Sequence, residues 1–389
     1  MRIKSVRAVR VAPSAPADPA TPPRRPSWHE TTVRGTRMSP YRYHNPSPAA
    51  VRAPRDPVWA RVEAEDGTWG LGLTGFGDPV AKVIDGHLAP LLMGQDCFAT
   101  RMASDVMWRA TAAYGSVGLA ACAISAVDLA LWDLVGKLQE QPVYRLLGGP
   151  SHAAVKCYAT SDDLDWSREL GFTAFKISNS WAPTDGDRGL REMEARVANA
   201  RNFVGPDATL GFNPVQSFDV DYAVQVCERL RPYNLAWIEQ PLPTEDLEGH
   251  IELRRRAPST RLATGENHQG LAAFRQLIEH RVVDILQPDI LWVGGLTTTV
   301  KVCAMAEAAG IAVSLHVGAN NPFGLHCAYA LPSVTDAEFW LGSAPGVPIA
   351  EANRIPGHSL PENGLAIPPD RPGFGLEIEP ASITPYFDQ

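Results

Sequence analysis

The chain lacks the features that mark several common classes of protein. Its 389 residues carry a formal net charge of −8, and no basic run is interleaved with aromatic residues, which argues against a nucleic-acid-binding surface. The N-terminal segment MRIKSVRAVR has no apolar core of the kind that a secretory signal needs. No stretch looks like the ~20 apolar residues of a membrane helix. We therefore expect a cytoplasmic protein with neither nucleic-acid nor membrane partners.

Closely spaced cysteines are also missing. The six cysteines are scattered along the chain and none belongs to a Cys-x-x-Cys pair. Because disulfide frameworks and cysteine zinc sites need such pairs, we expect buried, reduced thiols instead. The hydrophobic share of 45% and the charged share of 20% are ordinary for a globular chain, and the length suits two packed domains.

The N-terminal third combines strands, a proline-rich segment and a long helix. Residues 1–11 alternate as a strand does, whereas residues 12–26 contain too many prolines for a regular element. The segment VWARVEAEDGTWGLG predicts a β-hairpin that turns at Asp66 and Gly67. Apolar residues at helical spacing predict a helix over residues 118–138.

From Ala154 onward, short apolar runs alternate with helical stretches. There are eight such runs: AVKCYAT, FTAFKIS, ATLGF, LAWIE, LATGE, VVDILQPD, IAVSLH and AEFWL. Eight strands alternating with helices over about two hundred residues predict an α/β fold, a (β/α)₈ barrel. We expect a capping region over residues 1–120 and the barrel over residues 121–355. Residues 356–389 return to turns and short strands and are expected to pack on the N-terminal part.

Polar residues end seven of these runs. The chemistry of such barrels sits at the C-terminal ends of the strands. The seven residues are Lys176, Asn213, Glu239, Glu266, Asp289, His316 and Glu338. A single carboxylate after a strand is more often a helix cap than a catalytic group, but seven in phase are hard to explain as caps. We therefore interpret them as one site.

The residue types in this set suit metal-assisted proton transfer. Glu239 and Glu266 offer hard oxygen ligands of the kind that Mg²⁺ prefers. A divalent ion beside a substrate carboxylate can stabilise the enolate formed when the α-proton leaves. His316 is the natural base near neutral pH, and Asp289 could fix its tautomer. Lys176 would act as a second base or as a cation near the substrate carboxylate.

Several longer segments resemble one known family. DLALWDLVGK, PVYRLLGG, IEQPL, TGEN, QPDILWVGGLT and PENGLAIPPDRPGFG resemble the mandelate racemase branch of the enolase superfamily, over nearly the whole chain. Within that branch, CYAT, TDGDRGLR and RMSPYR are most similar to acid-sugar dehydratases of the L-rhamnonate dehydratase kind. The resemblance implies an α+β capping domain built from both termini, Mg²⁺, a sugar-acid substrate and a homo-oligomer, from dimer to octamer.

The resemblance also implies roles for individual residues. Glu239 and Glu266 match the second and third metal ligands of the family. Asp289 and His316 match the dyad that removes the α-proton and, in dehydratases, protonates the departing hydroxyl. Glu338 matches the carboxylate at the end of strand eight, and we expect it to contact the substrate.

Other positions are matched less closely. Lys176 matches the first lysine of the family's Lys-x-Lys pattern, but Ser178 replaces the second. With a base on only one face of the α-carbon of the substrate, we expect elimination to be favoured over racemisation. Trp28 and His29 fall where a substrate-gripping loop is expected. His268 could face the barrel mouth and bind substrate, or it could be a solvated loop histidine.

The first metal ligand of the family is an aspartate, and this chain has Asn213 in its place. Its carbonyl oxygen can bind Mg²⁺ but adds no charge, so we expect weaker metal binding. Three interpretations follow: a working site with Asn213, a non-catalytic sugar-acid-binding relative, or an introduced change. We favour the first, because the other site residues are present. Epimerisation through Lys176 and His316 is the alternative reaction.

Overall fold

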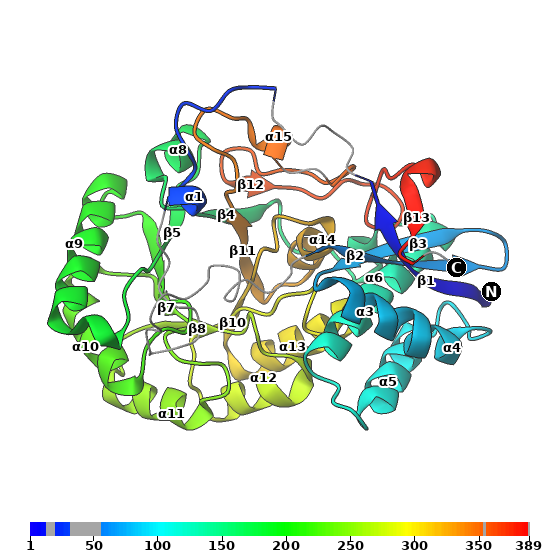
Figure 1. The fold of residues 1–389 in the computed structure, drawn as a ribbon, viewed down its shortest axis with the longest axis horizontal. Coiled ribbons are helices and arrows are strands. Elements are labelled where there is room, and N and C mark those ends of the chain that lie inside the picture. The colour runs from blue at the N-terminus through cyan, green and yellow to red at the C-terminus, as the bar shows by residue number, and fades with distance from the viewer. Residues whose placement is uncertain (13–19, 32–55, 353–354, 388–389) are drawn as a thin grey trace.

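The computed structural model describes residues 1–12, 20–31, 56–352 and 355–387. Two sheets organise them: a closed barrel of parallel strands and a smaller antiparallel sheet, with the two domains side by side (Figure 1). Both described ends of the chain lie in the domain with the smaller sheet (Figure 1). The predicted combination of a (β/α)₈ barrel and an α+β capping domain is therefore confirmed.

The barrel contains all eight predicted strands, each followed by a helix. The strands are β4 (Val155–Thr160), β5 (Ala174–Ser178), β6 (Thr209–Asn213), β7 (Trp237–Glu239), β8 (Leu262–Thr264), β9 (Ile285–Leu286), β10 (Ala312–Leu315) and β11 (Val334–Trp340). The helices that follow them are α8 (Leu164–Glu169), α9 (Gly186–Val204), α10 (Val220–Leu230), α11 (Leu247–Arg256), α12 (Gly270–Glu279), α13 (Gly295–Ala309), α14 (Pro322–Ala330) and α15 (Ile349–Ala352). Parallel pairing of β11 with β4 closes the ring.

Apolar side chains fill the space on both sides of the barrel wall. The main core lies between the strands and the surrounding helices. A separate small cluster joins Tyr158, Trp237, Ala263 and Ile285, one from each of four strands. The indole of Trp237 lies so close to Gly211 that an added Cβ there would come within 2.6 Å of the ring. This packed layer supports the polar residues at the strand ends.

The capping domain is a four-stranded sheet covered by helices. Its strands are β1 (Ile3–Val11), β2 (Val58–Ala64), β3 (Trp69–Thr74) and β13 (Ile383–Pro385), in the order β13-β1-β2-β3. Its helices are α3 (Gly77–Val83), α4 (Ala89–Leu92), α5 (Thr100–Thr111) and α6 (Leu119–Leu138), with α7 (Val143–Leu146) leading to the barrel. The predicted hairpin is confirmed as β2 and β3. The C-terminal segment pairs with the barrel through β12 (Leu365–Ala366) and with the cap through β13.

The helix α6 packs directly on the cap sheet. An added Cβ at Gly70 or Gly72 would lie 2.2 Å and 2.1 Å from the carbonyl oxygens of Ala130 and Ala126, so only glycine permits this approach. The domain boundary expected at residue 120 falls in the first turn of this helix. We therefore assign α6 to the capping domain, because its closest packing partner is β3, and the barrel strands begin at β4.

The same helix corrects one expectation about apolar runs. Among the residues that the structure describes, α6 alone is long and apolar enough to cross a membrane by length and composition. Within its most apolar window, 89% of the residues are buried inside the protein, as in the core helix of a globular domain. The six cysteines all lie in the described part; each is buried and free, as expected.

Candidate active site

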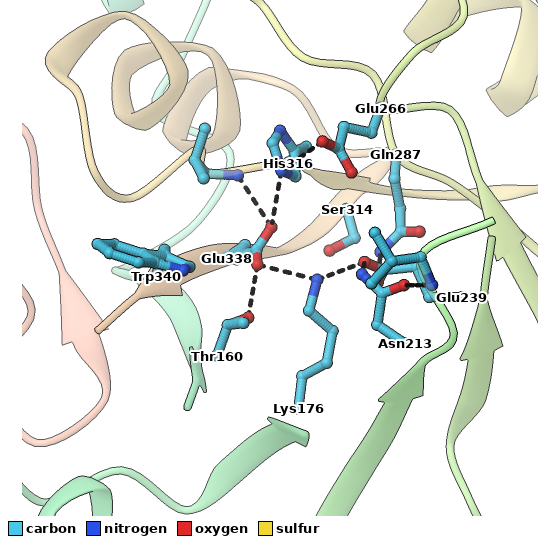
Figure 2. Close-up of polar contacts among 12 residues, drawn as sticks. Thr160, Lys176, Asn213, Glu239, Glu266, Gln287, Ser314, His316, Glu338 and Trp340 are labelled. Carbon is cyan, nitrogen blue, oxygen red and sulfur yellow. Dashed lines mark hydrogen bonds and ion pairs between the residues drawn. The ribbon is translucent and has the colours of Figure 1, made fainter. Parts of the chain in front are cut away.

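All seven strand-end residues meet in one buried network, as Figure 2 shows for most of them. The side chains lie on or directly after seven of the eight strands, β5 to β11, and those labelled in Figure 2 point toward one another. This convergence follows from the parallel strands, whose C-terminal ends open at the same face of a barrel. The predicted grouping of these residues is therefore observed, and their roles depend on the contacts described below.

His316 is held by Asp289 on one side and faces two glutamates on the other. Its Nδ1 lies 2.8 Å from Oδ2 of Asp289, whose second oxygen accepts the backbone N–H of Leu291 at 2.7 Å. The Nε2 atom lies 3.5 Å from Glu266 and 3.8 Å from Glu338. Because Asp289 accepts the Nδ1 proton, Nε2 is the nitrogen available for proton transfer.

The carboxylates around His316 make it a stronger base. Burial by itself would lower the pKa of His316, but the nearby charges of Glu266, Glu338 and Asp289 raise it to about 9. Burial raises the pKa of Asp289, while its hydrogen bond to His316 opposes that change. The pair therefore favours a charged imidazolium when no other cation is near.

Lys176 bridges two carboxylates beneath this dyad. Its side chain is only 1% exposed, and Nζ lies 2.5 Å from Oε1 of Glu239 and 2.9 Å from Oε1 of Glu338. Burial would lower the pKa of Lys176, yet these two carboxylates hold it well above its usual value. The ammonium is thus a fixed cation, which fits the second of its two expected roles.

Glu338 connects Lys176 to His316. One oxygen accepts the hydroxyl of Thr160 at 2.5 Å, and the other accepts the backbone N–H of Val317 at 3.1 Å. Burial would raise the pKa of Glu338, but Lys176, His316 and these donors lower it to about 2. It is therefore an ionised acceptor with a fixed orientation at the end of β11.

Glu239 is surrounded by donors on both oxygens. Oε1 accepts Nζ of Lys176 and the side-chain amide of Asn213, the latter at 2.6 Å. Oε2 accepts the indole N–H of Trp237 at 3.1 Å and the amide of Gln287 at 2.5 Å. Burial nevertheless raises the pKa of Glu239, against the opposing effect of the Lys176 charge.

This arrangement does not fit the expected Mg²⁺ ion as the side chains stand. Mg²⁺ needs oxygen ligands in a near-octahedral array. Asn213 points its N–H toward Glu239, and its only side-chain oxygen accepts the N–H of Val215 at 2.7 Å. Within the described residues, no three His, Cys, Asp or Glu side chains are grouped to hold a metal ion. Two of the expected ligands are carboxylates at strand ends, and at the third position the Asn213 oxygen faces the Val215 N–H while its N–H faces Glu239.

Ser178 occupies the position of the second lysine in the resembling family and is tied to its neighbours. Its hydroxyl and its backbone N–H donate to Asp162 at 2.5 Å and 2.9 Å. Arg196 pairs with the same carboxylate at 2.5 Å. Neither a serine hydroxyl nor a charged guanidinium is a base near neutral pH, so neither Ser178 nor Arg196 can act as a second base beside His316.

The N-terminal arm reaches the end of β11. Trp28, in the short helix α1 (Trp28–Thr31), is 4% exposed and donates its indole N–H to the carbonyl of Leu341 at 2.9 Å. The ring of His29 lies 5.2 Å, centroid to centroid, from that of Trp340. Trp340 follows Glu338 by two residues on the same strand, so both expected substrate-loop residues lie beside the site.

Asp163 anchors this arm, and its removal should release it. This buried carboxylate accepts the backbone N–H of Trp28 at 2.8 Å and pairs with Arg25. Asp163→Ala removes the carboxylate that accepts the Trp28 N–H, a loss worth about 1–3 kcal/mol. We expect amide exchange over residues 28–31 to speed up by roughly tenfold or more, as measured by hydrogen–deuterium exchange. Asp165→Ala removes only an exposed partner of Arg25 and should change exchange much less.

His268 does not join the network in the contacts described. It is buried, its ring packs against Phe274 of α12, and burial together with the nearby His250 lowers its pKa to about 3. The alternative of a solvated loop histidine is therefore wrong, because the side chain is 6% exposed. Its expected contact with substrate gains no support from the structure.

Three residues in the network were missed by the sequence analysis: Thr160, Trp237 and Gln287. Two of them, Trp237 and Gln287, could have been found from the two-residue period of extended chain, because residues two apart point the same way. Trp237 precedes Glu239 by two and Gln287 precedes Asp289 by two. Trp237 belongs to the apolar layer of the barrel, and its indole N–H also holds Glu239 in place.

Two family models match the chain. Residues 37–148 match the model described as the mandelate racemase / muconate lactonizing enzyme N-terminal domain. Residues 161–382 match the model described as enolase C-terminal domain-like. Together they cover most of the cap and the barrel after its first strand, since β4 falls between the two matched ranges.

Individual proteins of known sequence or structure are also similar to this chain. The chain is 38% identical over 322 residues to an L-rhamnonate dehydratase of Saccharopolyspora erythraea, covering 82% of each chain. The crystal structure of rhamnonate dehydratase from Gibberella zeae complexed with Mg matches with a TM-score of 0.87 and 28% identity, over 99% of this chain and 96% of that one. L-talarate dehydratase from Polaromonas, complexed with Mg and L-glucarate, matches with a TM-score of 0.74 and 26% identity, over 98% and 96%.

Proposed function

This chain belongs to the mandelate racemase and muconate lactonizing enzyme family of the enolase superfamily, and we propose that it is a sugar-acid dehydratase. The proposed substrate is L-rhamnonate or a related aldonate. The relatives named as rhamnonate and talarate dehydratases support a hydro-lyase of this class. A cytoplasmic location and a homo-oligomeric state stay predictions from the sequence.

The observation that carries this proposal is the His316–Asp289 dyad facing ionised Glu338. In the proposed reaction, neutral Nε2 of His316 takes the proton from the carbon next to the substrate carboxylate, leaving an enediolate. The electron pair then expels the hydroxyl of the neighbouring carbon, and His316 returns the proton so that water departs. The remaining enol rearranges to a 2-keto-3-deoxy acid.

Fixed charges around the dyad support this role. Asp289 holds the Nδ1 proton and so keeps the same tautomer through both proton transfers. The ammonium of Lys176 supplies positive charge next to Glu338 as the enediolate forms. Mg²⁺, the expected cofactor, has no part in these steps, because Asn213 presents an N–H where an oxygen ligand is needed.

Elimination is favoured over epimerisation by the same contacts. An epimerase needs a base on each face of the α-carbon. Lys176 is held as a cation between Glu239 and Glu338, and Ser178 is tied to Asp162. Neither Lys176 nor Ser178 is then available as a second base beside His316, which supports loss of the β-hydroxyl over inversion.

The test of the proposed function is a panel of aldonates that includes L-rhamnonate, with and without added MgCl₂. We expect 2-keto acid to form from at least one of them. Exchange of the α-proton without keto acid would favour the epimerase alternative. Binding of an aldonate with neither reaction would favour the non-catalytic relative, and Asn213→Asp would then show whether the ligand change disabled the site.

The pH dependence of turnover should report the raised pKa of His316. Only neutral His316 can take a proton, so in metal-free buffer kcat/KM should rise with pH and level off above about 9. A pH–rate profile, combined with NMR titration of the His316 ring, checks this. A ring that is already neutral at pH 7, with flat kcat/KM above it, would contradict the electrostatic account.

A further inference from the structure

We propose that Lys176 balances the charge of Glu239 while Asn213 donates a hydrogen bond to the same oxygen, and that the site does not retain a divalent cation at millimolar Mg²⁺. The proposal goes beyond the function above and holds whether or not the chain dehydrates a sugar acid. It separates this chain from the relatives whose structures contain Mg.

Both carboxylate oxygens of Glu239 already accept hydrogen bonds. Each accepts two donors: Lys176 and Asn213 on Oε1, and Trp237 and Gln287 on Oε2. A carboxylate has about four lone-pair positions, so all of them are in use. A cation approaching Oε1 would also meet the Lys176 ammonium, which lies 2.5 Å from that oxygen. Binding therefore requires that at least one donor be displaced in a buried site.

At position 213 an amide cannot accept the Val215 N–H and offer a second oxygen to a cation, as a carboxylate could. The one side-chain oxygen of Asn213 accepts the N–H of Val215 at 2.7 Å. Val215 and Gln216 both have positive φ, 55° and 60°, so this hydrogen bond closes a tight bend after β6. Turning the amide to offer its oxygen to a cation would set NH₂ against the Val215 N–H. An aspartate could accept that N–H with one oxygen and bind a cation with the other.

The expected ligand set of this chain also carries less negative charge than one with aspartate at position 213. With aspartate at position 213 the three expected ligands would carry three negative charges, whereas this chain has the two of Glu239 and Glu266. One of these, Glu239, is already in contact with Lys176. Because Mg²⁺ gives up its water reluctantly, the missing charge and the occupied oxygens both weaken binding.

Calorimetric titration with MgCl₂ tests the proposal directly. The full-length protein should show no saturable binding up to about 10 mM, whereas Asn213→Asp should bind at least tenfold more tightly. Glu239→Gln in the Asn213→Asp background should lose that gain. Asn202→Asp, an exposed position on α9, adds the same charge at the surface and should gain nothing.

Two titration results would contradict the proposal that the site does not retain Mg²⁺. Wild-type binding as tight as that of Asn213→Asp would overturn the proposal, and so would an Asn213→Asp variant that folds without gaining affinity. If that variant fails to fold, the wild-type titration decides alone, because saturable binding with a Kd below about 10 mM is incompatible with the proposal. None of these readouts uses turnover, so failure here leaves the dehydratase proposal standing.

Discussion

Replacing His316 by asparagine is expected to lower kcat for dehydration by roughly 10²–10⁴-fold. Its Nδ1 lies 2.8 Å from Asp289 and its Nε2 lies 3.5 Å from Glu266 and 3.8 Å from Glu338, while Lys176, the other basic side chain of the network, is held as a cation. Since the same imidazole removes the α-proton, exchange of that proton in D₂O should fall in parallel with keto acid formation.

The matched control for this variant is His280→Asn. His280 is exposed at the C-terminal end of α12, so its loss should leave both rates unchanged. Unfolding of both variants by urea shows whether the fold is retained. Dehydration that survives in a folded His316→Asn protein would remove His316 from the mechanism and, with it, the proposed function.

Replacing Lys176 by methionine is expected to lower the free energy of unfolding by about 3–5 kcal/mol, the usual cost of leaving a buried charge without its partner. Lys176, Glu239 and Glu338 are each at most 2% exposed, so solvent cannot replace the missing ammonium. Urea denaturation measures the change. Turnover should fall too, because Lys176 also fixes the orientation of Glu338.

A second substitution separates charge from packing in this prediction. Glu239→Gln in the Lys176→Met background removes one of the two stranded charges and should recover part of the lost stability. Lys4→Met, which removes a pair with Glu63 from a side chain that is 59% exposed, should cost less than about 1 kcal/mol. Equal losses for Lys176→Met and Lys4→Met would contradict the buried network.

The barrel could be predicted because its strands are short, apolar and evenly spaced. Parallel strands buried on both faces give continuous runs such as FTAFKIS, whose flanks differ clearly in composition. Strand ends were less accurate: VVDILQPD contains only two strand residues, Ile285–Leu286, since Gln287 and Asp289 leave the sheet to enter the site. The packing of α6 on Gly70 and Gly72 could not be predicted, because the apolar pattern of a helix does not show which element it packs against.

The site could be predicted in composition but not in its hydrogen bonds. Strand-end residues converge in any parallel barrel, so position along the chain was enough to group Lys176 with His316 and Glu338. Which way the Asn213 amide points depends on Val215 and Glu239, which become its neighbours only in the folded chain. The choice between base and cation for Lys176 likewise needed its two carboxylate partners.

The central claim is that His316 acts as the single base of an elimination, and one measurement tests it most directly. The protein is incubated with L-rhamnonate and related aldonates in D₂O, and NMR follows both the product and the recovered substrate. The account predicts a 2-keto-3-deoxy acid, with recovered substrate that keeps its configuration at the α-carbon. Recovered substrate with inverted configuration, or no change in any aldonate, would contradict it.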